Sequence, residues 1–367
     1  MINRLIFEAP LNNLSMGNVS INLLLEMWKK KIDVLYLPIG QPEIGNFNLP
    51  EEFKVWLQNA GNRFLKEFKK ADVHLKNWHL NGSHAWISDK RYLLTYHECS
   101  EATHEEINIV KNTTKTFFCG NYSSPIFKNF TDNVGNFNLG FDANSFQKTD
   151  KKYFNDNRIQ WFLGGKSEAR KNSLQVLSLW AKKFGKKEGE SYKPGERIHF
   201  LNVCIFNPFY DVKIQEQQIA QALGGVRYCN IQLFPFLGRE QFSDLLNSSN
   251  IDLTGLSSAE SWNLPSFNMT CLGKWSIVLN ATGHKAWANN NNSIQVSPNG
   301  MRSCVDNMFF QPNSPFNRGQ FYTFDNDEVI NAMDKAAEKA DTLNVEGEKL
   351  TTEFTYEKSL DNILKEI

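Results

Sequence analysis

The residues of this chain that are best suited to chemistry lie in a loop around Glu260. Residues 251–256 form a short apolar run, two serines break it, and Glu260 follows where a strand would have ended. Pro265 suits the first turn of a helix that we expect to run to Gly273, and residues 277–279 begin another strand. In doubly wound sheets, such a loop lies at the carboxyl ends of the strands, where ligands bind. The sequence therefore predicts a ligand-binding loop that carries one carboxylate.

Three cations lie in a second loop, directly after the strand expected at residues 159–163. The segment GGKSEARKN places Lys166, Arg170 and Lys171 just before an amphipathic helix. Backbone N–H groups at a helix start and nearby cations together favour the binding of an anion such as a phosphate. A solvated basic loop is the simpler alternative, and it stays open at this point.

The pattern of elements predicts an α/β chain of two domains. Its 367 residues are long for a single core, and apolar strands alternate with amphipathic helices throughout. A polar stretch, QKTDKKYFNDN, indicates a linker between the two halves. Residues 289–320 are rich in Asn, Pro and Gly and are expected to be irregular, whereas residues 327–343 predict a helix. Strands are further expected at 4–7, 32–37, 73–78, 91–96, 115–119, 136–139 and 197–204, with helices at 51–70, 103–110, 123–130, 212–223 and near the C-terminus.

The segment AESWNLPSFNMTCLGKWSIVL resembles the signature of the retaining nucleotide-sugar glycosyltransferases of family 4. That family usually reads Glu-x7-Glu across a Glu-Gly-Phe-Gly-Leu-Pro type segment, followed by a small residue, a glycine and a valine-rich strand. Asn268 stands where the second glutamate is expected, and Asn263 replaces a usual glycine. An amide both accepts and donates hydrogen bonds, whereas a carboxylate accepts from two ribose hydroxyls. The positions that fit are Glu260, Leu264, Pro265, Gly273 and the strand at 277–279.

The resemblance covers nearly the whole chain and implies a GT-B fold, in which two Rossmann-like domains face a central cleft. It assigns residues 1–150 to an N-terminal acceptor-side domain and residues 151–350 to a C-terminal domain that binds the nucleotide sugar. Residues 351–367 would form a terminal helix that crosses back to the N-terminal domain. The segment that closes the family's first domain is matched by Gly140, Asp142 and Phe146.

The resemblance also implies roles for the two loops of the second half. The family's Arg and Lys bind the donor diphosphate, and Lys171 matches the second of them. The position of the Arg is occupied by Gly165, so that either Lys166 or Arg170 would substitute. Glu260 would orient the donor sugar, with Asn263 and Leu264 beside it, and Asn268 would face the ribose. A loop at 282–285 fits a family loop near the sugar, and a plain surface position is the alternative for His284.

Two positions of the first half complete the expected site. Gly17 lies in the loop after the first strand, where the family approaches the donor phosphates, and a residue without a side chain lets the backbone come close to a ligand. A plain turn is the alternative. His97 follows a strand at its carboxyl end and would hydrogen-bond the transferred sugar as a catalytic residue beside Glu260. A buried histidine with partners inside the protein is the alternative.

The implied reaction moves a sugar from a UDP- or GDP-sugar to a hydroxyl of a glycan, a lipid or another acceptor, with retention at the anomeric carbon. No cofactor is expected, and no metal, because the cations would stabilise the leaving diphosphate. A nucleotide-sugar binding protein or scaffold without turnover stays open because of Asn268, as does a nucleotide-sugar epimerase. A glycan phosphorylase is disfavoured by the chain length, and a Rossmann dehydrogenase by the lack of Gly-x-Gly-x-x-Gly after the first strand.

Composition excludes several other classes. Forty basic and forty acidic residues cancel, so that no global field attracts nucleic acid or an anionic membrane. The six cysteines include no C-x2-C pair, so that the sequence does not predict a zinc site. No run of 18 apolar residues and no signal-peptide core are present. We therefore expect a cytoplasmic protein without an integral membrane segment.

Overall fold

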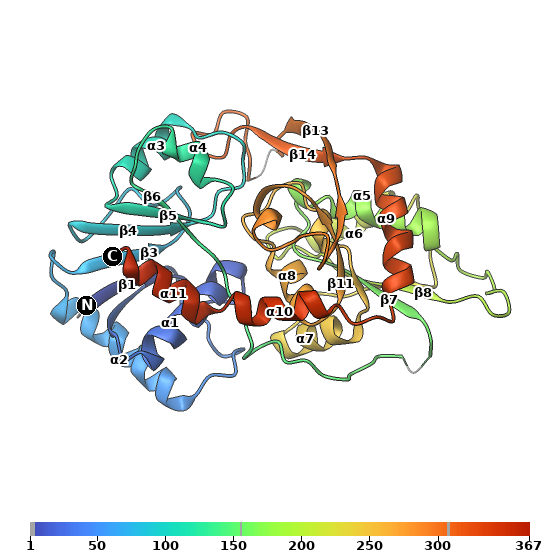
Figure 1. Ribbon diagram of the computed structural model, residues 1–367, viewed down its shortest axis with the longest axis horizontal. Helices are drawn as coiled ribbons and strands as arrows, with labels where there is room; N and C mark the ends of the chain where they lie inside the picture. The colour runs from blue at the N-terminus through green and yellow to red at the C-terminus, as the bar shows by residue number, and fades with distance from the viewer. Residues whose placement is uncertain (1–3, 155, 307–308) are drawn as a thin grey trace. The chain divides into compact units, whose positions relative to one another are not determined.

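The computed structural model describes residues 4–154, 156–306 and 309–367, which divide into two compact units (Figure 1). Unit 1 contains the described residues of Met1–Ser145, Asn307–Gln320 and Thr352–Ile367, and unit 2 those of Phe146–Asp306 and Phe321–Thr351. The sequence had assigned 309–320 to the second domain, but these residues belong to unit 1. The C-terminal residues also belong to unit 1, where Lys30 Nζ lies 2.9 Å from Asp361 Oδ1 and 3.3 Å from Glu357 Oε1.

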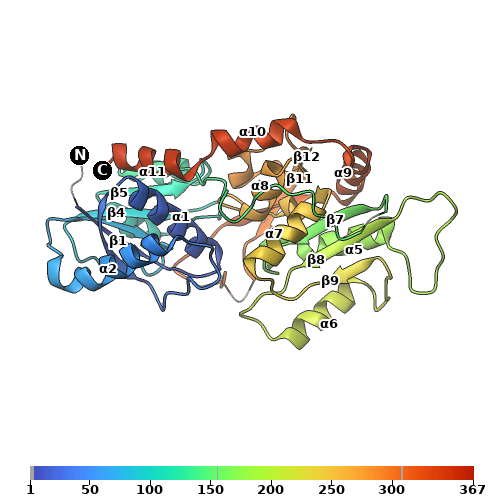
Figure 2. The same ribbon diagram turned by 90° about the horizontal axis from the view of Figure 1, so that it is seen from below.

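Unit 1 is built on a parallel sheet of six strands in the order β2-β1-β3-β4-β5-β6. Each strand and helix predicted in this half is found, with its ends shifted by a few residues. Helix α11 lies beside α1 (Figures 1 and 2). The strands are β1 (Arg4–Ala9), β2 (Asp33–Pro38), β3 (Val73–Asn77), β4 (Lys90–Thr95), β5 (Lys115–Cys119) and β6 (Val134–Phe137). The helices are α1 (Ser15–Lys29), α2 (Glu51–Glu67), α3 (His104–Lys111), α4 (Ser124–Lys128) and α11 (Tyr356–Lys365).

Residues 309–320 pack onto α3 of unit 1. Phe316 is 8% exposed and joins the core cluster that contains Leu80 and Phe118. The backbone N–H of Asn317 donates to Glu106 Oε1 at 2.8 Å, and that glutamate also closes a capping box at the start of α3. Sequence patterns missed this packing because scattered phenylalanines in a stretch rich in Asn and Pro have no periodicity.

Unit 2 is a second parallel sheet of six strands, in the order β12-β11-β10-β7-β8-β9, with β9 at one edge (Figure 2). The strands are β7 (Ile159–Gly164), β8 (His199–Cys204), β9 (Ile231–Leu233), β10 (Ile251–Asp252), β11 (Trp275–Leu279) and β12 (Ile294–Val296). The helices are α5 (Ser173–Phe184), α6 (Val212–Ala222), α7 (Arg239–Ser248), α8 (Leu264–Cys271), α9 (Asn326–Lys339) and α10 (Val345–Glu353). A two-stranded sheet adds β13 (Pro298–Ser303) and β14 (Gln320–Phe324).

Two expectations for this half were wrong. The segment expected to be irregular contains β12, β13 and the start of β14. The apolar run at 251–256 is a strand for two residues only, because Asp252 Oδ1 accepts a hydrogen bond from the Thr254 N–H at 2.9 Å and turns the chain into a 3-10 turn, η2 (Thr254–Leu256). Helix α10 was not predicted either, since its sequence has a weak apolar periodicity.

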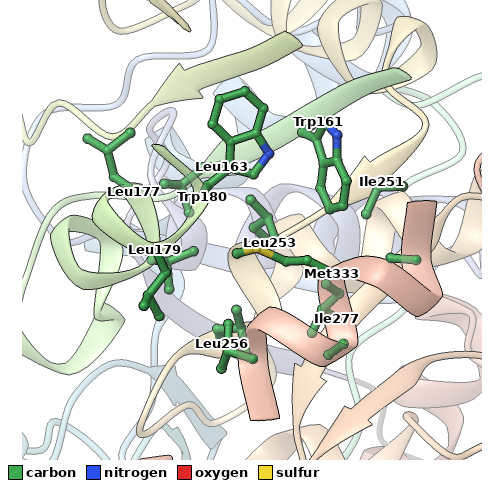
Figure 3. Close-up of a cluster of buried hydrophobic side chains, with 14 of the residues drawn as sticks. Trp161, Leu163, Leu177, Leu179, Trp180, Ile251, Leu253, Leu256, Ile277 and Met333 are labelled. Carbon is green, nitrogen blue, oxygen red and sulfur yellow. The ribbon is translucent and has the colours of Figure 1, made fainter. Parts of the chain in front are cut away.

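Buried side chains from strands and helices of unit 2 form its core on one face of the sheet. Figure 3 shows Trp161 of β7 and Trp180 of α5 beside Met333 of α9, with Ile251 and Ile277 from the neighbouring strands. The two indole rings meet edge to face, with their centroids 6.5 Å apart. Aromatic pairs in this geometry add to the stabilisation from burial. The rigid layer fixes β7 and β10, from whose ends the candidate loops emerge.

The order of the strands places a switch point between β7 and β10. From β7 the chain moves outward through β8 to β9, whereas β10 pairs with the other side of β7 and leads through β11 to β12. The loops after β7 and β10 therefore diverge from adjacent strands at the carboxyl edge of the sheet. In open α/β sheets this is where ligands bind.

Candidate functional site

The two loops singled out in the sequence lie against each other at the switch point of unit 2. The Arg170 carbonyl accepts hydrogen bonds from the Ser258 N–H at 2.7 Å and from Ser257 Oγ at 3.1 Å. Asn172 donates through Nδ2 to Ser258 Oγ at 2.7 Å and to the Leu256 carbonyl at 2.9 Å. The two serines that break the apolar run thus fasten the loop that carries Glu260 (the carboxylate loop, residues 257–263) to the loop that carries the three cations (the cation loop, residues 165–172).

Glu260 forms ion pairs with two of the predicted cations. Its Oε1 contacts Lys171 Nζ, and its Oε2 lies 3.1 Å from Arg170 Nη1. The side chains are 5%, 11% and 11% exposed in that order, so water screens the pairs weakly. Burial opposes ionisation of Glu260, but the charges of Lys171 and Arg170 outweigh it and hold the pKa of the carboxyl well below its ordinary value. Glu260 is therefore an ionised acceptor and not a proton donor at neutral pH.

Lys166 and Arg170, which the sequence could not separate, lie in different surroundings. Arg170 contacts Glu260, whereas Lys166 Nζ lies 3.5 Å from Glu168 and 5.2 Å from the centroid of the Phe209 ring. Burial and the neighbouring cations lower the pKa of Lys166, against the charge of Glu168. The geometry thus favours Arg170 as the partner of Lys171.

Glu168 is a site residue that sequence reasoning missed. Its side chain is 5% exposed and accepts a hydrogen bond from Arg170 Nε at 3.0 Å. Burial disfavours its charge, but Arg170, Lys171 and Lys166 together lower the pKa of the carboxyl. The sequence interpretation used only the three cations of GGKSEARKN. An acidic residue between cations could have indicated an internal ion pair. Glu168 contacts Nε of Arg170 and Glu260 contacts Nη1, so that the two carboxylates together fix the direction of the guanidinium.

Asn263 supports the carboxylate loop from behind. Its backbone is left-handed, with φ at 67°, a conformation that glycine and asparagine adopt at the least cost. This explains why asparagine can stand where the resemblance expects glycine. Its Nδ2 donates to the Thr254 carbonyl at 2.9 Å and lies 3.0 Å from His284 Nε2. The side-chain nitrogen thus has two partners within the protein. A donor-binding role for Asn263 stays a prediction.

His284 is fully buried, so that the surface position considered for it was wrong. Its Nδ1 lies 3.0 Å from the Leu279 carbonyl, which can only accept, and the neutral tautomer therefore carries its proton on Nδ1. Nε2 then accepts from Asn263. Next to it, Thr282 Oγ1 accepts from the Glu260 N–H at 3.1 Å. The loop at 282–285 thus orients Glu260 through the backbone.

We expect His284 to make the stability of unit 2 depend on pH. Burial lowers the pKa of this imidazole to about 4, and burial lowers that of His199 likewise. Because the unfolded chain binds these protons first, the free energy of unfolding is highest above about pH 6.5 and falls as the pH drops towards 4, by up to about 3 kcal/mol for each histidine. Chemical denaturation of His284→Gln between pH 4 and 7 should show a smaller dependence of the free energy of unfolding on pH than the wild type. The exposed His84→Gln should retain the full slope, and an unchanged slope in His284→Gln would contradict the expectation.

Helix α8 carries the two remaining candidates of this half. Leu264 is its first residue and is partly exposed. Asn268 is 4% exposed, and within the described part of the chain its Oδ1 has no hydrogen-bond partner. A buried polar atom without a partner costs free energy unless a ligand or water satisfies it. Asn268 therefore has an acceptor available, which is consistent with a role in binding, and its role stays a prediction.

His97 lies in unit 1 and has partners there. It is 2% exposed, with Nδ1 3.2 Å from Ser123 Oγ and Nε2 3.7 Å from Glu106 Oε2. Its ring also meets those of Phe118 and Phe127 edge to face. These contacts match the alternative of a buried histidine with internal partners, while contact with a sugar stays a prediction.

Gly17, the other candidate of unit 1, lies in the first turn of α1 against the preceding loop. A Cβ atom added there would lie 2.2 Å from the Asn12 carbonyl oxygen and 2.4 Å from its nitrogen. The missing side chain is therefore used by the protein's own backbone. We expect Gly17→Ala to displace this loop and to lower the free energy of unfolding by about 1–3 kcal/mol in chemical denaturation.

Gly61→Ala is the matched control for that variant. It lies in α2, where an added Cβ would have its nearest neighbour at 3.8 Å, and alanine favours a helix by about 1 kcal/mol over glycine. A stable Gly17→Ala protein would contradict the tight packing of this loop.

The described residues contain no group of three or more His, Cys, Asp or Glu side chains arranged to hold a metal ion. None of the described helices combines the length and apolarity needed to cross a membrane.

Comparisons with known proteins rest on structure. No protein-family profile and no curated protein sequence matches the chain. Sucrose-phosphate synthase from Thermosynechococcus elongatus is similar in structure, with a TM-score of 0.64, 11% identity, and coverage of 99% of this chain and 98% of the other. Anabaena HepE in complex with UDP and glucose has a TM-score of 0.62 and 12% identity, with coverage of 99% of this chain and 98% of the other. For α,α-trehalose 6-phosphate synthase from Burkholderia multivorans, the TM-score is 0.61 and the identity 9%, with coverage of 100% of this chain and 98% of the other. The predicted fold class is thus confirmed: this chain has the GT-B fold of these glycosyltransferases, with two Rossmann-like α/β units.

Proposed function

We propose that this protein is a retaining glycosyltransferase, which moves a sugar from a nucleoside diphosphate donor to an acceptor hydroxyl. The observation that supports this most is the assembly of Arg170, Lys171 and Glu260 at the switch point of the unit 2 sheet. That edge of the sheet is where open α/β folds bind ligands. The assembly offers two positive groups and one acceptor within one small region.

The charges around the cation loop favour a diphosphate. Lys166, Arg170 and Lys171 lie with Glu168 and Glu260 in one network, so that three positive charges meet two negative ones. Arg302 adds a fourth positive charge at 2.6 Å from the Ala169 carbonyl, which leaves an excess of two. A leaving diphosphate gains negative charge as the sugar bond breaks, and preorganised cations stabilise that charge. No metal would be required for this step, in our proposal.

The sugar end of the donor would contact Glu260. Because its pKa lies well below the ordinary value, this carboxylate accepts hydrogen bonds from sugar hydroxyls and does not deliver a proton. Asn268, with its free acceptor, would hydrogen-bond a ribose hydroxyl. Leu264 and the backbone of Asn263 would lie beside the sugar. His97 and Gly17 stay proposed contributors from unit 1.

The similar structures bear on the donor. HepE was solved with UDP and with UDP-glucose, which makes a UDP-sugar our first candidate and a GDP-sugar the second. The acceptor would be a glycan, a lipid or another compound with a hydroxyl group. We further propose a cytoplasmic location, which fractionation of cells that express the tagged protein would test.

The experiment is a panel of UDP-, GDP- and ADP-sugars, with calorimetry for binding and chromatography for products. Transfer or slow hydrolysis of one donor, with the anomeric configuration retained in the NMR spectrum of the product, would support the proposal. Binding of nucleoside diphosphates without turnover across the panel would favour the alternative of a nucleotide-sugar binding protein or scaffold. Conversion of the donor to its epimer would favour an epimerase, and no binding of any nucleotide would overturn all three.

A further inference from the structure

Arg302 reaches the cation loop from a strand that no motif predicts. It lies on β13, and its Nη2 donates to the Ala169 carbonyl at 2.6 Å and to Asn172 Oδ1 at 3.3 Å. Its guanidinium carbon is 5.9 Å from the centroid of the Phe321 ring on β14. The 3-10 turn η1 (Ala169–Lys171), which carries two of the site cations, is thus held at both of its ends by one side chain.

Asn172 links Arg302 to the carboxylate loop through the hydrogen bonds of its side chain. Its backbone is left-handed, with φ at 54°, where the chain passes from η1 into α5. While Oδ1 accepts from Arg302, Nδ2 donates to Leu256 and Ser258 in the loop that leads to Glu260. Strand β14 adds a bond from the Tyr322 N–H to the Ser258 carbonyl at 3.4 Å. One amide group therefore joins β13, the cation loop and the carboxylate loop.

We infer that Arg302 is a positioning residue, which sets η1 so that Arg170 and Lys171 face the diphosphate together. The inference rests on the proposed function of the site. Without Arg302, the Ala169 carbonyl and Asn172 Oδ1 each lose a charged donor, and the strained backbone of Asn172 loses one of its restraints. Loss of Arg302 should therefore weaken the binding of the diphosphate group and leave the contacts of the base and ribose unchanged.

The test compares the affinities of a nucleoside diphosphate and of the free nucleoside, measured by calorimetry on the full chain. We expect Arg302→Met to weaken the diphosphate about tenfold or more and the nucleoside less than about threefold. Asn172→Gly keeps the left-handed backbone and removes the amide, so it should give a similar selective loss. Since Arg302 and Asn172 share one hydrogen bond, the double variant should lose less than the product of the single losses.

Amide hydrogen exchange of residues 166–172 in the ligand-free protein gives a second readout, which does not depend on the ligand. It should be faster in Arg302→Met and unchanged in Arg197→Gln, a control whose partner is Asp341. Unchanged exchange, or losses that multiply in the double variant, would overturn the inference while leaving the proposed function intact. If Arg302→Met exchanges faster but the wild-type protein binds no nucleoside diphosphate, the proposed function is overturned, while Arg302 is still the residue that orders η1.

Discussion

Replacement of Lys171 by methionine is expected to lower the rate of sugar transfer several hundred-fold, in line with about 3–4 kcal/mol of lost transition-state stabilisation. Its side chain is 11% exposed and belongs to the network around Glu260, so that its charge acts in a poorly screened environment. Methionine keeps most of the side-chain volume and removes only the charge. Affinity for the nucleoside diphosphate should fall as well, because the cation would contact the phosphates in both the donor and the product.

Lys183→Met is the matched control for this prediction. Lys183 lies on α5, in the same unit, and pairs at 2.8 Å with Asp334, whose side chain is 57% exposed. Exposed pairs of this kind contribute little to stability, and the variant should transfer sugar at the wild-type rate. Equal rates in Lys171→Met and Lys183→Met would refute the assignment of the cation loop.

The architecture of this protein could be predicted because it depends on local pattern. Strands such as β1 and β7 each contain three consecutive apolar residues, at 5–7 and 161–163, as expected for parallel strands covered on both faces, and helices such as α5 show clear periodicity. The loops after β7 and β10 could also be found, since residue type and the strand-loop-helix context both indicated them. What the sequence could not supply was the pairing between these loops.

The residues whose surroundings the sequence did not reveal are held by contacts outside their own strand or helix. Arg302 contacts Asn172 from a stretch rich in Asn and Pro, where no periodicity marks a strand. His284 is buried by its bonds to Leu279 and Asn263, although its own segment gives no sign of burial. The close packing at Gly17 was missed for a similar reason, because the atoms that exclude a side chain belong to the preceding loop. Such contacts depend on tertiary packing and leave no local signal.

The second large effect is expected for Glu260→Gln, which should lower the rate of transfer several hundred-fold while it preserves or strengthens binding of the nucleoside diphosphate. The amide keeps the shape of the side chain but loses the charge that strengthens hydrogen bonds from sugar hydroxyls, at a cost of about 3–4 kcal/mol in the transition state. In the absence of this carboxylate, Lys171 and Arg170 lose their nearest competitor for the phosphates. Steady-state kinetics and calorimetry on the same preparation measure the two effects.

The control is Glu348→Gln, since this glutamate pairs with Lys148 on the surface of unit 2, and it should change neither quantity. The opposite effects on nucleotide affinity separate the two site variants: Lys171→Met weakens the product, whereas Glu260→Gln does not. Because Lys171 Nζ contacts Glu260 Oε1, the double variant should lose less activity than the product of the single losses. A Glu260→Gln enzyme that transfers sugar at the wild-type rate would contradict a catalytic role for this carboxylate, and losses that multiply in the double variant would show that Lys171 and Glu260 act independently.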